Sequence, residues 1–160
     1  MTVMPNEANT SSPRLAMVLV RSGNLFCALP LESVIETLRS PPVTAIAGAP
    51  GWVLGVAVIR GAAVVIIDLG ILLGPDSVEG KQTRVVTLRV GDRVVGLAVE
   101  SIIGVRDFER TVLAEVPPLL LQAHPEVLTA IGLLDGDLML VLDGSRIITE
   151  QELARLENSP

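Results

Sequence analysis

Two apolar runs dominate the middle of the sequence, Val53–Ile59 and Ala62–Ile67, and only Arg60-Gly61 separates them. A membrane span needs about 20 apolar residues with few or no charges. This stretch carries Arg60 near its middle and Asp68 in its second half, and a charge at mid-membrane costs about 2.5–3.5 kcal/mol. Its Val and Ile content is typical of strands. We therefore predict a buried hairpin that turns at Arg60-Gly61, without direct membrane insertion.

Turn residues divide the rest of the chain into short strands. Strands are expected over 15–21, 25–29, 34–39, 84–90, 93–99, 101–107, 130–134 and 137–142. Residues 31–39 fit either a helix or a turn that runs into a strand, and we favour the turn with a strand from Val34. Asp68 can cap a short helix over 69–73, and a second short helix is expected over 149–157. Many short strands with only short helices predict an all-β barrel or a pair of barrels.

The expected domain organisation places one β domain over 14–150. Residues 1–13 are polar and are expected to form a disordered tail. Residues 151–160 are expected to complete a C-terminal helix and tail, and a polar linker near 75–83 is the candidate boundary between two halves. A faint repeat supports two halves: Gly61 and Asp68 are seven residues apart, as are Gly136 and Asp143, each time across an apolar run.

Composition argues against several function classes. The net charge is −6 and the 12 basic residues are scattered, whereas nucleic-acid binding leaves a basic patch. The single cysteine, Cys27, lies in an apolar run, and the single histidine, His124, lies beside a proline, so no zinc site, disulfide or nucleophile–base pair is expected. We predict a non-enzymatic protein without cofactor or metal. No secretory signal is evident, which favours a cytoplasmic location.

Arg60 is the candidate functional residue, because a lone arginine between two apolar runs must reach the surface or find a partner. One interpretation is a hairpin-tip arginine in water. The other is an arginine that a carboxylate holds and that the protein offers to a partner. Glu36 is the candidate carboxylate, since it interrupts an apolar pattern in another predicted strand. The arginine fork can bind a carboxylate through two parallel hydrogen bonds.

Five segments follow one another in order over residues 15–150. They are Leu29-Pro-Leu-Glu-Ser-Val-Ile-Glu36, Gly55-Val-Ala-Val-Ile-Arg-Gly61, Val64-Val-Ile-Ile-Asp-Leu69, Gly96-Leu-Ala-Val-Glu100 and the closing hairpin from Ile131 to Asp143. This order resembles that of CheW-like chemotaxis coupling proteins. The hallmark of that family is Gly-Val-x-Asn-Leu-Arg-Gly, then an apolar strand with a proline, then Ile/Val-Asp-Leu.

The resemblance implies two small five-stranded SH3-like barrels packed side by side. It implies an adaptor that joins the cytoplasmic tips of methyl-accepting chemoreceptors to the regulatory domain of a CheA-type histidine kinase, in an array that controls motility. By position, Glu36 and Arg60 match a family pair near the receptor-binding surface. Val34 and Val105 match apolar positions that meet the receptor between the barrels.

Three positions depart from the family pattern: Val58 replaces an asparagine, Val65 a proline and Glu100 an aspartate. These departures leave open a specialised paralogue, from a non-flagellar system or with receptor contact but no kinase contact. A small-ligand barrel and a self-associating β module remain further alternatives. Three more residues are assigned either to a partner surface or to the structure itself: Ile59, Gly61 and Ile102.

Overall fold

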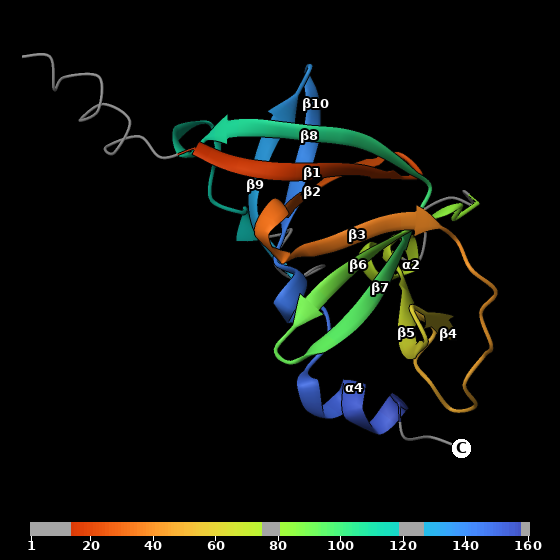
Figure 1. Ribbon diagram of the computed structural model, residues 1–160. Helices are drawn as coiled ribbons and strands as arrows, with labels where there is room; N and C mark the ends of the chain where they lie inside the picture. The colour runs from red at the N-terminus through yellow and green to blue at the C-terminus, as the bar shows by residue number, and fades with distance from the viewer. Residues whose placement is uncertain (1–13, 75–80, 119–126, 158–160) are drawn as a thin grey trace, which may run out of the picture.

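The computed structural model describes residues 14–74, 81–118 and 127–157 (Figure 1). The predicted tail, most of the predicted linker and His124 lie outside these residues. The elements in chain order are β1 (Arg14–Ser22), β2 (Leu25–Pro30), η1 (Leu31–Ser33), β3 (Val34–Arg39), β4 (Val53–Ile59), β5 (Ala62–Asp68), α2 (Leu69–Leu73), β6 (Arg84–Val90), β7 (Arg93–Val99), β8 (Ser101–Glu109), η2 (Arg110–Val112), β9 (Leu128–Leu134), β10 (Asp137–Leu142), η3 (Gly144–Arg146) and α4 (Glu150–Glu157).

The strands form two five-stranded sheets, which confirms the all-β prediction. Sheet A has the order β8-β1-β2-β10-β9, and sheet B has the order β3-β6-β7-β5-β4. The two sheets lie one above the other in Figure 1, with the short helices α2 and α4 on the side of sheet B. The turn over 31–33 followed by a strand from Val34 is confirmed as well.

The two sheets are interleaved along the chain. Strands β1–β5 and β6–β10 repeat one plan, in which a hairpin is followed by a single strand and then by a second hairpin. Hairpin β1–β2 lies between β8 and β10, and hairpin β6–β7 lies between β3 and β5. The first hairpin of each repeat therefore pairs with strands of the other repeat. The linker near 75–83 therefore separates the two repeats. It does not separate the two sheets, because it joins α2 to β6 within sheet B.

The faint repeat in the sequence corresponds to this plan. Gly61 and Gly136 both have positive φ, 77° and 90°, at the tips of the hairpins β4–β5 and β9–β10. The residue before each glycine, Arg60 or Asp135, also has positive φ, 55° and 50°. Two successive left-handed residues define the tight turn that matches the twist of a two-residue hairpin.

One apolar cluster connects the two sheets. It contains buried side chains from sheet A, from sheet B and from α4, for example Leu29, Leu97 and Leu153. Burial of aliphatic side chains supplies about 25 cal/mol for each Å² of apolar surface. The predicted C-terminal helix is therefore part of the shared core, with Leu153 and Leu156 facing inward.

Each sheet curls so that its two outer strands approach each other. In the connection between β3 and β4, Thr44 pairs with Val56 of β4. Each backbone N–H donates to the other residue's carbonyl oxygen at 2.8 Å. After β8 the chain returns to β9 in the same way, through Ala114 and Ile131. The curling brings the tip of β4–β5 close to β3.

Asp68 caps α2, as its position before Leu69 predicts. Its Oδ1 accepts a hydrogen bond from the backbone N–H of Ile71 at 3.1 Å, and the helix ends at Gly74. We expect Asp68→Ala to lower the free energy of unfolding by about 2 kcal/mol or more, because it removes this cap and also a hydrogen bond that Oδ1 accepts from Gln82 Nε2 at 2.8 Å. Urea denaturation followed by circular dichroism checks this, and an unchanged midpoint contradicts the capping role.

Within the described residues, none of the helices has the length and apolar content that crossing a membrane requires.

Candidate functional site

The tip of hairpin β4–β5 presents Arg60 to solvent. Ile59 before it is buried, and Gly61 after it completes the turn. The Arg60 side chain is 79% exposed. A hairpin tip is a rigid support, because the strands on either side fix the direction in which its side chains leave the backbone.

Glu36 lies on β3, at a bulge where the pairing register with β6 shifts. The buried side chain of Thr87, on β6, is hydrogen-bonded to the backbone of this bulge. The Thr87 hydroxyl accepts from the Glu36 backbone N–H at 3.1 Å and donates to the Glu36 carbonyl oxygen at 3.2 Å. A bulge re-aims a side chain, and here it directs Glu36 toward the hairpin tip. No pattern in the sequence marked Thr87 as functional.

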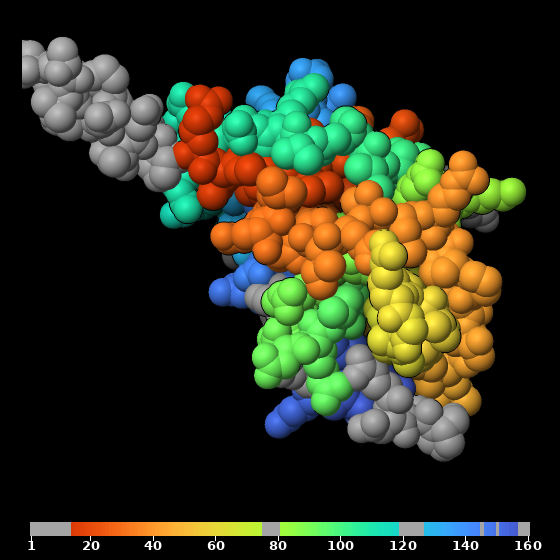
Figure 2. Space-filling model, viewed as in Figure 1, coloured from red at the N-terminus to blue at the C-terminus, as the bar shows by residue number. Residues whose placement is uncertain are grey.

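The structure confirms the predicted pairing of Glu36 with Arg60. Arg60 Nη2 donates to Glu36 Oε1 at 2.8 Å, and Nε donates to Oε2 at 3.1 Å. In Figure 2 the yellow atoms of the β4–β5 hairpin reach the orange atoms of β3. The Arg60 side chain is therefore exposed to water, and a carboxylate fixes its direction, which combines the first interpretation with the carboxylate contact of the second.

The hydrogen bond from Arg60 lowers the pKa of Glu36 from its ordinary value of 4.5 and raises the pKa of Arg60. Because the folded-state pKa of Glu36 is depressed, the pair contributes to stability above the ordinary glutamate range. The contribution is lost as the pH falls through the lowered pKa.

We expect NMR titration of the Glu36 carboxyl carbon to give a midpoint below the ordinary glutamate value. In Arg60→Ala the midpoint returns to the ordinary range, because both the hydrogen bonds and the opposite charge are gone. An unchanged midpoint in that variant would show that the pair does not persist in solution.

A shallow hollow of about 290 Å³ lies beside the pair. Its lining is mostly apolar and comes from β3, β4, β5, β6 and β7; the residues are Ile35, Glu36, Ile59, Arg60, Ala62, Val64, Thr87, Arg89 and Val94. The arrangement combines an apolar surface with a fixed charge at its rim. Such a surface can bind a protein segment.

The other predicted contact residues lie on the outer strands of the two sheets. Val34 opens β3 and is half-buried against the core. Val105 lies on β8 and is 58% exposed. Ile102, also on β8, is half-buried and lines a hollow of about 260 Å³ with Thr37 and two further residues. The structure joins Glu36 with Arg60 directly, and it leaves Val105 on the edge strand of the other sheet.

A family model for the CheW-like domain matches residues 16–152 of the chain. The chain belongs to the CheW-like domain family. Relatives extend the match over most of the sequence. The chemotaxis protein CheW of Klebsiella aerogenes is 28% identical over 137 residues, 85% of this chain and 82% of that protein. Protein PilI of Pseudomonas aeruginosa is 37% identical over 101 residues, 62% of this chain and 57% of that protein. Protein FrzA of Myxococcus xanthus is 29% identical over 115 residues, 70% of each chain.

The fold agrees with a solved CheW-like structure. The crystal structure of the scaffolding protein TtCheW from Thermoanaerobacter tengcongensis superposes with a TM-score of 0.72 at 19% identity, covering 80% of this chain and 88% of that one. The SH3-like architecture of two packed five-stranded units is therefore confirmed. CheW-like proteins are non-enzymatic scaffold components of chemosensory systems.

This CheW-like chain has a second ion pair at the equivalent hairpin tip, which the sequence analysis missed. Arg106 Nη2 on β8 lies 3.6 Å from Asp135 Oδ2 at the tip of β9–β10. The charge of this tip residue is therefore opposite to that of Arg60. The positive φ shared by the two tip residues is the structural sign of this equivalence. The Asp135-Gly136 turn was readable from sequence, but its partner on a distant strand was not.

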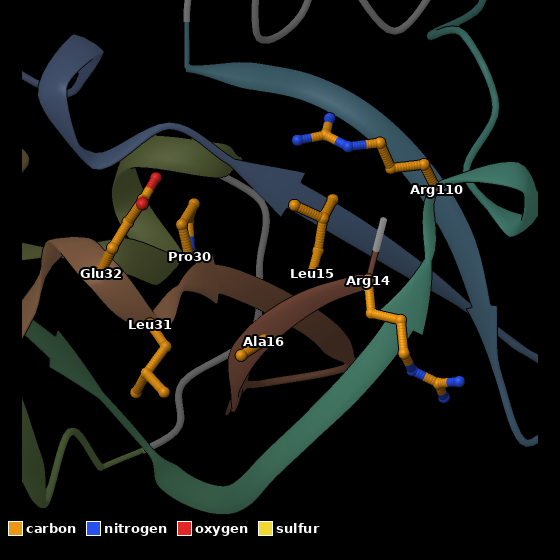
Figure 3. A pocket seen from close by; sticks show the side chains of 7 residues that line it. All are labelled: Arg14, Leu15, Ala16, Pro30, Leu31, Glu32 and Arg110. Carbon is orange, nitrogen blue, oxygen red and sulfur yellow. The ribbon is translucent and has the colours of Figure 1, made fainter. Parts of the chain in front are cut away.

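A further hollow and a single cysteine carry polar or reactive groups in the described part of the chain. A hollow of about 440 Å³ is lined by Arg14, Glu32, Arg110 and four apolar residues, and in Figure 3 the two arginines point away from each other. Cys27 is fully buried, and burial raises the pKa of its thiol to about 12, so it packs as a small apolar side chain. The described residues contain no group of three potential ligands that could hold a metal ion.

Proposed function

We propose that this CheW-like protein is a cytoplasmic adaptor that couples chemoreceptors to a CheA-type histidine kinase in a chemosensory array. The observation that carries the proposal is the two-bond pair between Glu36 and Arg60 at an exposed hairpin tip beside an apolar hollow. The proposed receptor surface contains this pair together with Val34 and Val105, and the receptor partner is the cytoplasmic tip of a methyl-accepting chemoreceptor.

Physical reasons favour a binding surface of this kind. Arg60 is held in one direction before any partner arrives, so less conformational entropy is lost on binding than with a free arginine. Val105 adds exposed apolar surface that a partner can bury. The affinity of one such surface need only be modest, because a receptor array is multivalent.

The test is direct binding to two purified partners, measured separately. We expect the protein to bind a soluble receptor cytoplasmic fragment and a CheA regulatory domain in calorimetry or pull-down. The matched negative control is a receptor fragment that lacks the tip. The adaptor proposal fails if the intact fragment is retained no better than the fragment without its tip.

A second candidate is a specialised paralogue that binds receptors but not the kinase. Val58, which stands where the family pattern has asparagine, is 72% exposed and so alters the outer surface of β4. The highest identity among the relatives described above is to protein PilI, over a shorter region than the match to CheW. Binding to the receptor fragment without binding to the regulatory domain would favour this candidate.

A further inference from the structure

A buried polar cluster joins the two sheets at one corner of the molecule. The side-chain amide of Gln82 donates from Nε2 to Asp68 Oδ1 at 2.8 Å and to Ser22 Oγ at 3.2 Å. Ser22 and Asp68 are 2% and 8% exposed. Ser22 belongs to sheet A, while Asp68 belongs to sheet B. We call these three residues, Ser22, Gln82 and Asp68, the latch.

The latch lies next to the strands that support the proposed receptor surface. Ser22 is the last residue of β1, and β1 pairs along its length with β8, which carries Val105. Gln82 stands two residues before β6, and β6 pairs with β3, which carries Glu36. The latch therefore ties β1 to β6, each of which directly supports one of the two outer strands (Figure 1).

Backbone contacts around Gln82 extend the same connection. The carbonyl of Thr83 accepts from the backbone N–H of Ser40, just after β3, at 3.0 Å. The Thr83 hydroxyl donates to the carbonyl of Glu100 at 2.7 Å, where the chain passes from β7 in sheet B to β8 in sheet A. The N–H of Glu100 in turn donates to the carbonyl of Arg21 at 2.9 Å. A displacement of residues 82–83 is thus transmitted to β3 and to β8.

Hydrophobic attraction between the sheets is non-directional, so it constrains their relative orientation less sharply than hydrogen bonds do. Hydrogen bonds are directional. The latch carries a cost, since the buried Oε1 of Gln82 has no hydrogen-bond partner in the described part of the chain. At the equivalent end of β6, the position of Ser22 is taken by the apolar Val90. A polar cluster with such a cost at this corner fits a role in positioning better than a role in stability alone.

The geometry points to Gln82 as a positioning residue that sets the spacing between β3 and β8, and with it the receptor affinity of the surface that these strands carry. The affinity part of this inference rests on the proposed function. The spacing part does not depend on any partner.

Two variants perturb the latch in different ways. Gln82→Met keeps a similar length but removes both amide donors. Gly70→Ala inserts a wedge, because its new Cβ would lie 2.9 Å from Ser22 Oγ and 3.3 Å from Gln82 Nε2. The control is Val141→Ala, which leaves a cavity in a separate apolar cluster of sheet A and lowers the melting temperature without touching the latch.

The spacing is measured by pulsed electron–electron distance spectroscopy between labels at Arg39→Cys on β3 and Asp107→Cys on β8. Cys27 is buried and does not compete for the label. We expect both latch variants to shift or broaden the distance distribution and the control to leave it unchanged. Unchanged distances in both latch variants would overturn the inference.

Receptor affinity is then measured by calorimetry with the unlabelled variants. We expect both latch variants to weaken binding of the receptor fragment about tenfold, while the control binds as the parent does. Altered distances with unchanged affinity would overturn the link between spacing and binding. If the parent protein itself does not bind the fragment, the proposed function fails, and the distance measurement still decides whether the latch sets the spacing.

Discussion

The substitution Arg60→Glu is expected to weaken association with the receptor fragment about a hundredfold or more while leaving the fold intact. It places a carboxylate opposite Glu36 and reverses the charge that the hairpin tip offers to a partner. Unfavourable like-charge contacts at an interface cost several kcal/mol, which corresponds to such a loss of affinity. The fold should survive because the Arg60 side chain is mostly exposed. Calorimetry measures the binding, and circular dichroism confirms the fold.

Two further proteins separate charge from geometry. Arg110→Glu changes the net charge equally at an exposed site on η2, directly after β8, and it should bind the fragment as the parent does. The double variant Glu36→Arg with Arg60→Glu restores an ion pair with reversed direction. We expect it to remain unable to bind, because the partner meets the wrong charge. Full binding by the single variant Arg60→Glu would remove Arg60 from the receptor surface.

The substitution Gly55→Ala is expected to cost at least about 3 kcal/mol of stability. Gly55 has φ of 145°, and an added Cβ would lie 2.0 Å from the carbonyl oxygen of Thr44. The backbone must move, which strains the residue by about 1–2 kcal/mol. It also breaks the two hydrogen bonds between Thr44 and Val56, each worth about 1 kcal/mol. The curled edge of sheet B should open, which denaturant unfolding and amide exchange at Val56 would detect.

Gly51→Ala is the matched control for this experiment. A Cβ at Gly51 meets no atom within 4 Å, so the same chemical change should leave stability almost unchanged. A small and equal change in the free energy of unfolding for both substitutions would contradict the prediction. It would show that the segment between β3 and β4 can move enough to accommodate a Cβ at Gly55.

The sequence was informative wherever the determinant of structure is local. Alternating or continuous apolar runs bounded by Gly-Asp or Asp-Gly defined the hairpins, because strand period and turn chemistry depend on adjacent residues. The Asp68 cap was predictable for the same reason, since it involves residues three positions apart. The choice of Glu36 as the partner of Arg60 came from an interrupted apolar pattern and from the family resemblance.

The sequence could not show features that depend on distant pairing. Nothing in the local pattern says that β1 pairs with β8, or that the linker near 75–83 joins two strands of one sheet. The support of Glu36 by Thr87 depends on a bulge between strands that are about fifty residues apart. The hydrogen bond between Gln82 and Ser22 joins residues that are sixty positions apart. Gln82 lies in a polar segment that resembled an ordinary linker, so its residue type did not indicate a buried contact.

The interleaved order of the strands also determines when each sheet can be completed during synthesis. All five strands of sheet B lie in one continuous stretch, from β3 to β7. Sheet A is divided by that stretch, because β1 and β2 leave the ribosome first while β8, β9 and β10 leave last. In hairpin β1–β2, the edge of β1 therefore stays unpaired until β8 has emerged, and the edge of β2 stays unpaired until β10 has emerged. Contacts of such sequence separation slow folding, so the growing chain exposes its first hairpin for longer than any other.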